Sequence, residues 1–281
     1  MKKSSLLLFS SLLLANNLLA NDSYLDSADA FKALLDTPIY SASKKLENSF
    51  KSASATYVLT NEDIRRSGVT NIPDALRLVP GVQVAQITAN KWAVSIRGFN
   101  AQLANKLLVL IDGRSVYTPL FAGVNWDVQD VLIEDIEQIE VIRGPAASMW
   151  GANAVNGVIN IITKHSSETV DDMLNLAVGN EEEFIGSYRK GGSFGNGNFY
   201  RIYGKHAEHD SSEGPTSDEW NLSQAGFRAD LGKNKKDNLA FSGNLYHSRQ
   251  DRSSEFPTSV APFTFDNFYE DKLRCGHFKF N

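Results

Sequence analysis

Hydrophobic and polar positions follow two different patterns along the chain, and the pattern changes near residue 165. Before it, short apolar runs alternate with polar residues that are typical of helix starts and turns. After it, segments of about ten residues alternate in polarity and are separated by Gly, Asn, Asp and Lys. The first pattern predicts a mixed domain of helices and strands, and the second predicts a series of strands with two unlike faces.

Residues 55–165 carry recognisable element boundaries. Thr60 begins a predicted helix that Gly68 ends, and Asn71 begins a second helix. Residues 127–133 predict a third helix. Short apolar runs predict strands at 56–59, 82–85, 92–96, 107–111, 138–142 and 157–163. The sequence therefore predicts a compact α+β domain, in which the apolar run 107–111 is covered on both faces.

Residues 166–281 show the strict alternation, for example at 199–206, 227–231 and 239–245. Outer-membrane barrel strands have this pattern, but so does an ordinary β-meander in water, and the alternation alone leaves both open. Strands of about 9–11 residues with their turns give roughly six antiparallel strands. Because the smallest common barrels have about eight strands, we expect an incomplete transmembrane β-barrel, truncated after its N-terminal part.

The N-terminus has the composition of an export signal. In residues 1–20, Lys2 and Lys3 precede a leucine-rich stretch, and Ala20 precedes polar residues. This pattern predicts a signal peptide that is cleaved near Ala20. A membrane anchor is the alternative, but the apolar stretch is shorter than the ~20 residues that a spanning helix needs. Residues 21–54 are polar and small, which predicts a flexible lead-in.

Composition and charge exclude several function classes. The chain has 281 residues, of which 42% are hydrophobic, and a formal net charge of −5. This acidic balance argues against a nucleic-acid-binding protein, which needs cations to neutralise phosphates. Cys275 is the only cysteine, which excludes an intrachain disulfide and a multi-thiolate metal site. His206 and His209 are three residues apart and would face opposite sides of a strand. We expect no metal, no cofactor and no catalytic residues.

Five sequence blocks follow one another between residues 55 and 165. They read IPDALRLVPGV at 72–82, IRGF at 96–99, LLVLIDGR at 107–114, IEVIRGP at 139–145 and WGANAVNGVINIITK at 150–164. In this order they closely resemble the plug domain of TonB-dependent outer-membrane receptors. The resemblance implies a plug seated inside a barrel of about 22 strands. It also implies import of a scarce nutrient, usually a ferric siderophore, with energy passed from the inner membrane by TonB.

Members of this family carry a TonB box, a short segment ahead of the plug that pairs as a strand with TonB. An extended segment with β-branched and aromatic residues suits this role, because its main chain can hydrogen-bond to the edge of a partner sheet. Pro38 lacks an N–H and departs from the commoner valine-rich pattern, and a plain linker is the alternative. The candidate box is Thr37, Pro38, Ile39, Tyr40, Ser41 and Ala42.

The resemblance also assigns roles to charged and aromatic residues. Arg97, Glu140 and Arg143 stand where plug residues of the family pair with carboxylates on the barrel wall. An ion pair within the plug is the alternative, above all for Glu140. Aromatic residues in the candidate apical loops either stack on a ligand or pack against the barrel wall. These ligand-facing candidates are Trp92, Phe99, Tyr117, Phe121 and Trp126.

Two functional hypotheses follow. The first is the N-terminal part of a receptor in the outer membrane of a Gram-negative cell. Its partners would be TonB, an iron-siderophore or similar ligand, and membrane lipid. The second hypothesis is a soluble periplasmic binding or signalling module that uses a plug-like domain without a barrel. Membrane fractionation distinguishes the two.

Overall fold

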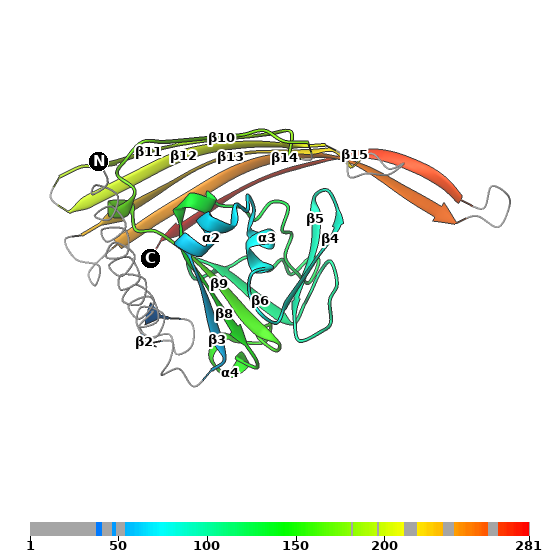
Figure 1. Ribbon diagram of the computed structural model, residues 1–281, viewed down its shortest axis with the longest axis horizontal. Coiled ribbons are helices and arrows are strands. Elements are labelled where there is room, and N and C mark those ends of the chain that lie inside the picture. The colour runs from blue at the N-terminus through cyan, green and yellow to red at the C-terminus, as the bar shows by residue number, and fades with distance from the viewer. Residues whose placement is uncertain are drawn as a thin grey trace, which may run out of the picture.

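The computed structural model describes residues 38–40, 47–48, 54–180, 182–195, 197–210, 218–232, 239–257 and 264–280. The predicted signal peptide, residues 1–20, lies outside the described residues. An α+β domain packs against one side of a curved sheet of long strands (Figure 1). Two short strands ahead of the domain, β1 (Pro38–Ile39) and β2 (Glu47–Asn48), pair antiparallel with each other.

The elements of the α+β domain are short and closely spaced. In chain order they are β3 (Thr56–Thr60), α2 (Asn61–Ser67), α3 (Ile72–Leu76), β4 (Val82–Thr88), β5 (Lys91–Ile96), β6 (Leu107–Ile111), β7 (Arg114–Ser115), the 3-10 helix η2 (Ile133–Asp135), β8 (Ile136–Arg143), α4 (Ala147–Trp150) and β9 (Gly157–Thr163). Five strands form one sheet in the order β3-β8-β9-β6-β7, and β4 and β5 form a separate hairpin.

The two predicted helix starts are confirmed. The Thr60 hydroxyl accepts a hydrogen bond from the backbone N–H of Asp63, whose carboxylate accepts one from Thr60, so α2 begins with a capping box. Gly68 ends α2 in the left-handed conformation, with φ of 71°. At the start of α3, the Asn71 side chain accepts a hydrogen bond from the backbone N–H of Asp74. Local side-chain chemistry therefore sets these boundaries.

The buried centre of the domain sheet confirms the prediction for residues 107–111. All five residues of β6 are buried, and β6 pairs in parallel with β9. Strand β9 also pairs antiparallel with β8, so it lies between two strands and is itself almost wholly buried. A continuous apolar run suits such a strand, since both of its faces are covered.

The helix predicted over residues 127–133 is wrong. Only a 3-10 helix forms, at Ile133–Asp135. The apolar residues Val128, Val131 and Leu132 are buried, as an amphipathic helix would require. However, the backbone carbonyl of Asp130 accepts a hydrogen bond from Gln224 on the long-stranded sheet. A side chain of that sheet thus provides a hydrogen bond to a backbone carbonyl, which in an α-helix would be bonded within the helix.

The long strands form a six-stranded antiparallel sheet, which we call the wall. Its strands follow one another in sequence order, so each pairs with the next along the chain. This confirms the predicted number of strands and their antiparallel pairing. The strands are β10 (Met173–Ala177), β11 (Phe184–Ser193), β12 (Asn198–His209), β13 (Trp220–Leu231), β14 (Leu239–Pro257) and β15 (Thr264–Phe280). A second 3-10 helix, η3 (Ser166–Glu168), leads from β9 to β10.

The domain and the wall share one hydrophobic core. Trp220 and Leu222 on β13 belong to the same buried cluster as Leu59, Ile139 and Ile159 of the domain. The ring of Trp92 in β5 meets that of Trp220 edge to face, with centroids 6.4 Å apart. Apolar burial therefore holds the domain on the wall.

Within the part of the chain described here, no helix is both long and apolar enough to span a membrane.

Candidate functional site: the interface between the domain and the wall

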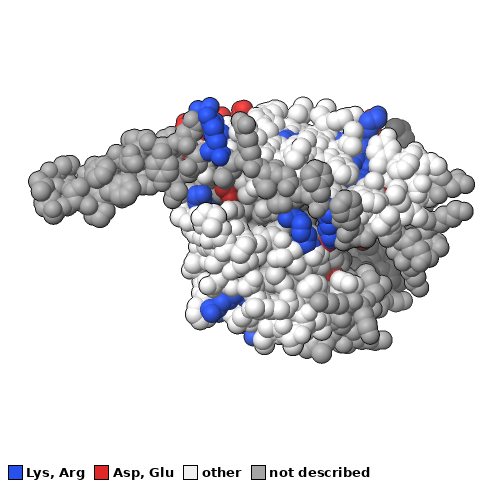
Figure 2. Space-filling model, turned by 180° about the vertical axis from the view of Figure 1, so that it is seen from behind, with Lys and Arg blue, Asp and Glu red and all other residues white. Residues whose placement is uncertain are grey.

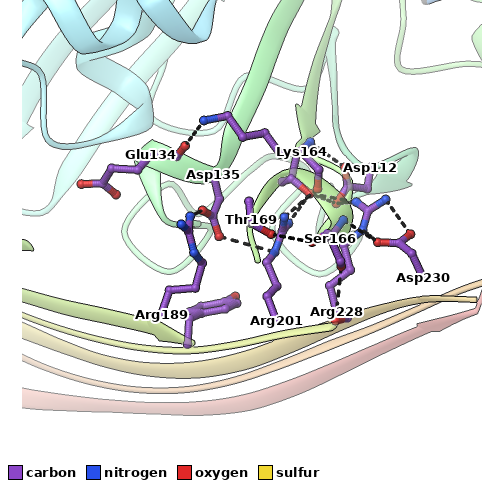
Figure 3. Close-up of polar contacts among 12 residues, drawn as sticks. Asp112, Glu134, Asp135, Lys164, Ser166, Thr169, Arg189, Arg201, Arg228 and Asp230 are labelled. Atoms are coloured by element: carbon purple, nitrogen blue, oxygen red, sulfur yellow. Dashed lines mark hydrogen bonds and ion pairs between the residues drawn. The ribbon is translucent and has the colours of Figure 1, made fainter. Parts of the chain in front are cut away.

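Asp135 is the centre of a buried ion cluster at the interface (Figure 3). It ends η2, and its side chain is 3% exposed. It forms an ion pair with Arg189 on β11, and its Oδ2 lies 3.4 Å from the Nε of Arg201 on β12. The antiparallel register pairs Gly191 with Arg201, which places the two arginines diagonally on one face. One carboxylate of the domain thus binds two strands of the wall.

The Thr163 hydroxyl lies at the centre of a second group of contacts. It donates to Asp112 Oδ2 at 2.9 Å and accepts from Arg201 Nη2 at 2.8 Å and Arg228 Nη1 at 2.9 Å. Asp112 also accepts from the Thr163 backbone N–H, and its carboxylate lies 3.5 Å from the Arg228 guanidinium. Arg228 also donates two hydrogen bonds to the carboxylate of Asp230, its neighbour on β13, and thus forms a bidentate ion pair. The end of β9 is therefore fixed to β12 and β13.

The connection that leaves the domain continues this network. The Lys164 carbonyl accepts a hydrogen bond from Arg201 at 2.6 Å, and the Ser166 N–H donates to Asp230 at 2.9 Å. The Lys164 ammonium turns back and donates to the carbonyl of Glu134 and the side chain of Asn61. Burial lowers the pKa of Lys164, although Asp135 opposes this effect. Both ends of the turn are thus held by charged groups.

A further ion pair joins Lys205 of β12 to Asp130 of the domain, and both side chains are mostly buried. Charges buried in this way cost desolvation energy, which their mutual attraction offsets only when both partners are present. Removing one partner therefore costs much more than removing an exposed pair. In these pairs, carboxylates of the domain face cations of the wall: Asp135 faces Arg189 and Arg201, and Asp130 faces Lys205.

The tip of the β4–β5 hairpin makes a separate set of contacts with the wall. The Ala89 N–H donates to Asp218 at 2.7 Å, and the Trp220 indole donates to the Ala89 carbonyl at 3.1 Å. The Asn90 side chain donates to Gln250 on β14. The domain is thus held at two levels, one near Asp135 and one at this tip.

The opposite face of the wall is apolar and exposed. The strand registers place Leu174 beside Tyr188 and Ile202 beside Phe227, and all four side chains are exposed. Leu245 on β14 belongs to the same face and is 57% exposed. In Figure 2, uncharged atoms occupy much of the top edge, where the wall lies, between groups of charged residues. Exposed apolar surface of this extent marks a contact with lipid or protein.

Residues 48–158 match the family model described as the TonB-dependent Receptor Plug Domain. Residues 48–158 therefore form a plug domain of the kind found in TonB-dependent receptors. The α+β domain is the plug, and the strands that follow are the first antiparallel strands of a receptor wall.

Curated relatives agree with this assignment. The chain is 29% identical over 171 residues to the vitamin B12 transporter BtuB of Vibrio vulnificus, and 31% identical over 183 residues to the ferric enterobactin receptor PirA of Pseudomonas aeruginosa. These alignments cover 60% and 59% of this chain, but only 27% and 24% of those proteins. The chain thus spans about a quarter of the length of the curated relatives that it matches.

A solved receptor structure shows the same fold. FpvA of P. aeruginosa, in a complex with iron and a heterologous pyoverdine, superposes with a TM-score of 0.59 at 15% identity. The superposition covers 84% of this chain and 33% of FpvA. Plug and wall together are therefore arranged as in a receptor of this family.

The three charged residues that the resemblance singled out lie within the plug. Glu140 is fully buried and accepts hydrogen bonds from the Tyr40 N–H at 2.9 Å and from Gln138 at 2.6 Å. The Arg143 guanidinium donates to the Pro80 carbonyl at 3.1 Å, and Arg97 is exposed. Among the described residues, neither arginine has an ion-pair partner. Their pairing with carboxylates of the barrel wall stays a prediction.

The five aromatic candidates fall into two groups. Trp92 and Trp126 are buried in the core shared with the wall. Phe99 and Phe121 are exposed, and Tyr117 is half-buried. A role in ligand binding stays a prediction for all five.

Only Pro38, Ile39 and Tyr40 of the TonB-box candidate are described; Thr37, Ser41 and Ala42 lie outside the described residues. Gln138 donates to the Pro38 carbonyl at 3.1 Å, and Ile39 is fully buried. The segment is thus held against β8 by Gln138 and Glu140.

Sequence reasoning missed the arginines of the wall, Arg189, Arg201 and Arg228. The alternation of the strands could have indicated them. Each arginine lies on the strand face that carries buried apolar residues, for example Arg189 with Ile185 and Arg228 with Leu222. Charged residues at such inward positions indicate partners on a packed domain.

Proposed function

We propose that this chain supplies the plug and the first wall strands of an outer-membrane receptor that imports a scarce nutrient, with a ferric siderophore as the ligand class. One observation carries the proposal: a buried, charge-matched interface joins the plug to one face of the wall, while the other face is apolar and exposed. An outer-membrane wall needs an apolar surface toward lipid and a polar surface toward its lumen.

The ligand class draws on the relatives. Those that the chain matches include one protein named a vitamin B12 transporter and one named a ferric enterobactin receptor. A receptor for such large polar molecules needs a passage that stays closed except during transport. The ion pairs and hydrogen bonds that hold the plug beside its apolar contacts suit this purpose, because both partners of such a contact can exchange it for water without a large net change in free energy.

Energy would come from TonB through residues 37–42. The described part of this segment supports the role, because its backbone is held only by pairing with the two residues of β2 and by side-chain contacts from Gln138 and Glu140. A partner strand could compete for the same backbone groups by strand addition. Export to the outer membrane would depend on the signal peptide predicted at residues 1–20.

The alternative, a soluble periplasmic module, is not favoured by the wall. Its outer face exposes Leu174, Leu176, Ile202 and Leu245, each at least 50% exposed. A sheet in water would normally cover or replace such residues.

Uptake measurements test the proposed function. The complete receptor is produced in a Gram-negative strain that lacks its own siderophore receptors, with and without TonB, and accumulation of labelled iron is followed. We expect accumulation only with TonB, and its loss when residues 37–42 are replaced by a Gly-Ser segment. A protease-resistant product in the periplasmic fraction, with uptake unchanged by either alteration, would contradict the proposal.

A further inference from the structure

A cavity of about 70 Å³ lies between the plug and the wall, beside the ion network of Figure 3. Asp112 and Asp135 line it from the plug, and Arg201, Arg228 and Lys279 line it from β12, β13 and β15. Since about 10–15 Å³ is enough to hold one water molecule, the cavity has room for a small ion together with water.

Positive groups converge on this cavity. Arg201 Nη2 and Arg228 Nη1 both donate to the Thr163 hydroxyl oxygen, at 2.8 Å and 2.9 Å. Two guanidinium groups thus lie close together on one uncharged atom, and their like charges repel each other. The Lys279 ammonium brings a third positive charge, and it donates to the backbone carbonyl of Asp112, which is also uncharged.

The carboxylates beside the cavity do not balance these cations. The charge balance includes the residues that line the cavity, their ion-pair partners Arg189 and Asp230, and Glu137, whose charge acts on Arg228. Cations then exceed carboxylates by one, and Lys279 is the cation whose hydrogen bond goes to an uncharged group. The cations are Arg114, Arg189, Arg201, Arg228 and Lys279, and the carboxylates are Asp112, Asp135, Asp230 and Glu137.

The cavity also borders polar atoms whose hydrogen bonds are incomplete. Within the described part of the chain, the buried Nε–H of Arg201 donates no hydrogen bond and Oδ2 of Asp135 accepts none, although only 3.4 Å separates the two atoms. Buried polar atoms usually have a partner, so these two atoms indicate that the contents of the cavity are polar. Because a buried excess charge destabilises a folded protein, the extra cation favours an anion among these contents.

A wider cavity leads to the same groups from the side of the lead-in. It measures about 620 Å³, and Arg228 and Lys279 line it together with Ile39 and Tyr40. An ion can therefore reach the smaller cavity without separating the buried ion pairs. Lys279 comes from β15, the edge strand of the described wall. A side chain of a further strand would start about 4.8 Å beyond β15 and would have to reach past this lysine.

We infer that the smaller cavity binds a small monovalent anion, such as chloride, between Lys279 and the guanidinium groups of Arg201 and Arg228. One negative charge balances the extra cation and weakens the repulsion among the three positive groups. Since this site exists only where plug and wall meet, the anion stabilises the docked plug, and more so as its concentration rises. The inference goes beyond the proposed function, because it concerns an ion that holds the plug and not the imported ligand.

Hydrogen exchange of the Thr163 amide tests the inference on the complete receptor in detergent, because this N–H donates to Asp112 beside the cavity. Exchange is compared in sodium chloride and in sodium gluconate, which has a much larger anion, at equal ionic strength so that general screening is the same. At a chloride concentration ten times its Kd, the Thr163 amide should exchange about tenfold more slowly than in gluconate.

Lys279→Gln removes the extra charge and keeps a hydrogen-bond donor. In this variant the Thr163 amide should exchange at the same rate in both salts. The matched control is Lys190→Gln, which removes an exposed lysine paired with Asp172 and should keep the tenfold difference. Equal exchange of the parent in the two salts, or a chloride effect that persists in Lys279→Gln, overturns the inference.

Crystals of the parent receptor grown in sodium bromide give a second measurement, which does not depend on a variant. The anomalous signal of bromide should appear beside the Lys279 ammonium. Density for bromide elsewhere but not in this cavity contradicts the site.

Discussion

Asp135 of the plug and Arg189 of the wall form an ion pair in which both side chains are almost fully buried. Arg201 shares the same carboxylate from the next strand. The aspartate is 54 residues from Arg189 in the chain, so the pair joins two separately formed parts of the molecule. It also lies close to the covalent junction between plug and wall, where Lys164 and Ser166 bind to the same network.

Asp135→Asn should weaken the docking of the plug strongly. The variant leaves two buried arginines without their counter-charge, which costs about 3–5 kcal/mol in comparable pairs. Hydrogen exchange of the amides in β8 and β9 of the complete receptor measures the loss. The control is Asp172→Asn, which removes an exposed pair with Lys190 at 3.4 Å and should cost about 0–1 kcal/mol. Equal protection in the two variants would contradict the importance of the buried cluster.

Gly191→Ala should disturb the junction. A Cβ at this position would lie 1.7 Å from the Thr169 carbonyl oxygen, which is backbone and cannot move aside freely. We expect a loss of at least about 1–3 kcal/mol, typical of overpacking, in the denaturation of the complete receptor. Gly204→Ala on β12 is the control, because its Cβ would meet only the Gln224 carbonyl oxygen at 3.9 Å. A Gly191→Ala receptor as stable as the control would show that the connection does not cross β11 so closely.

Asp127→Asn tests a buried acid. Burial raises the pKa of Asp127 above its ordinary value of 3.8, although Lys91 at 4.0 Å opposes the shift. A raised pKa means that the folded state binds the Asp127 proton more tightly than the unfolded state does. The resulting stabilisation is fully present below pH 3.8 and is lost as the pH rises through the folded-state pKa. At about pH 7 the buried carboxylate is ionised and destabilises the folded state, and the neutral asparagine removes this cost.

We therefore expect Asp127→Asn to raise Tm near neutral pH, and the difference from the parent to shrink as the pH falls. Thermal unfolding of both receptors across the acid range measures it. A difference that grows toward low pH would contradict the assignment of a raised pKa.

Gln138→Ala should loosen the lead-in. It removes the hydrogen bonds from Gln138 to the Pro38 carbonyl and to Glu140, which itself holds the Tyr40 N–H. One hydrogen bond contributes about 1 kcal/mol net, so exchange of the Tyr40 amide should accelerate about fivefold. Gln83→Ala is the control, since Gln83 lies on β4 and only accepts a long contact from Ser95 at 3.5 Å. Unprotected exchange of Tyr40 in the parent would show that the segment is not held at β8.

Local chemistry in the sequence predicted much of the plug. The Thr60 cap, the glycine at 68 and the apolar run of β6 each specify an element without help from distant residues. The predicted helix at residues 127–133 failed because Asp130 finds its partners on the wall, Lys205 and Gln224. A pattern of apolar residues does not reveal such distant partners.

The ion network between plug and wall could not be predicted from the sequence either, because its partners are far apart in the chain. Alternation along β12 and β13 predicts which residues share a face, but not which plug carboxylate lies opposite Arg201 or Arg228. The resemblance pointed instead to Arg97, Glu140 and Arg143, whose partners on the wall stay untested. Folding of the plug onto the wall decides these pairings.

A nitroxide scan along β13 would show whether one face of the wall meets lipid and the other meets the plug. Single labels are placed at residues 223 to 229 of the complete receptor, with Cys275 replaced by serine, and the receptor is reconstituted in lipid. We expect a two-residue period, with labels at Ala225 and Phe227 accessible to oxygen dissolved in the bilayer and labels at Gln224 and Arg228 shielded by the plug. Labels at Ala225 and Phe227 that contact a water-soluble nickel chelate instead, or accessibility without this period, would contradict a wall that faces lipid on one side and the plug on the other.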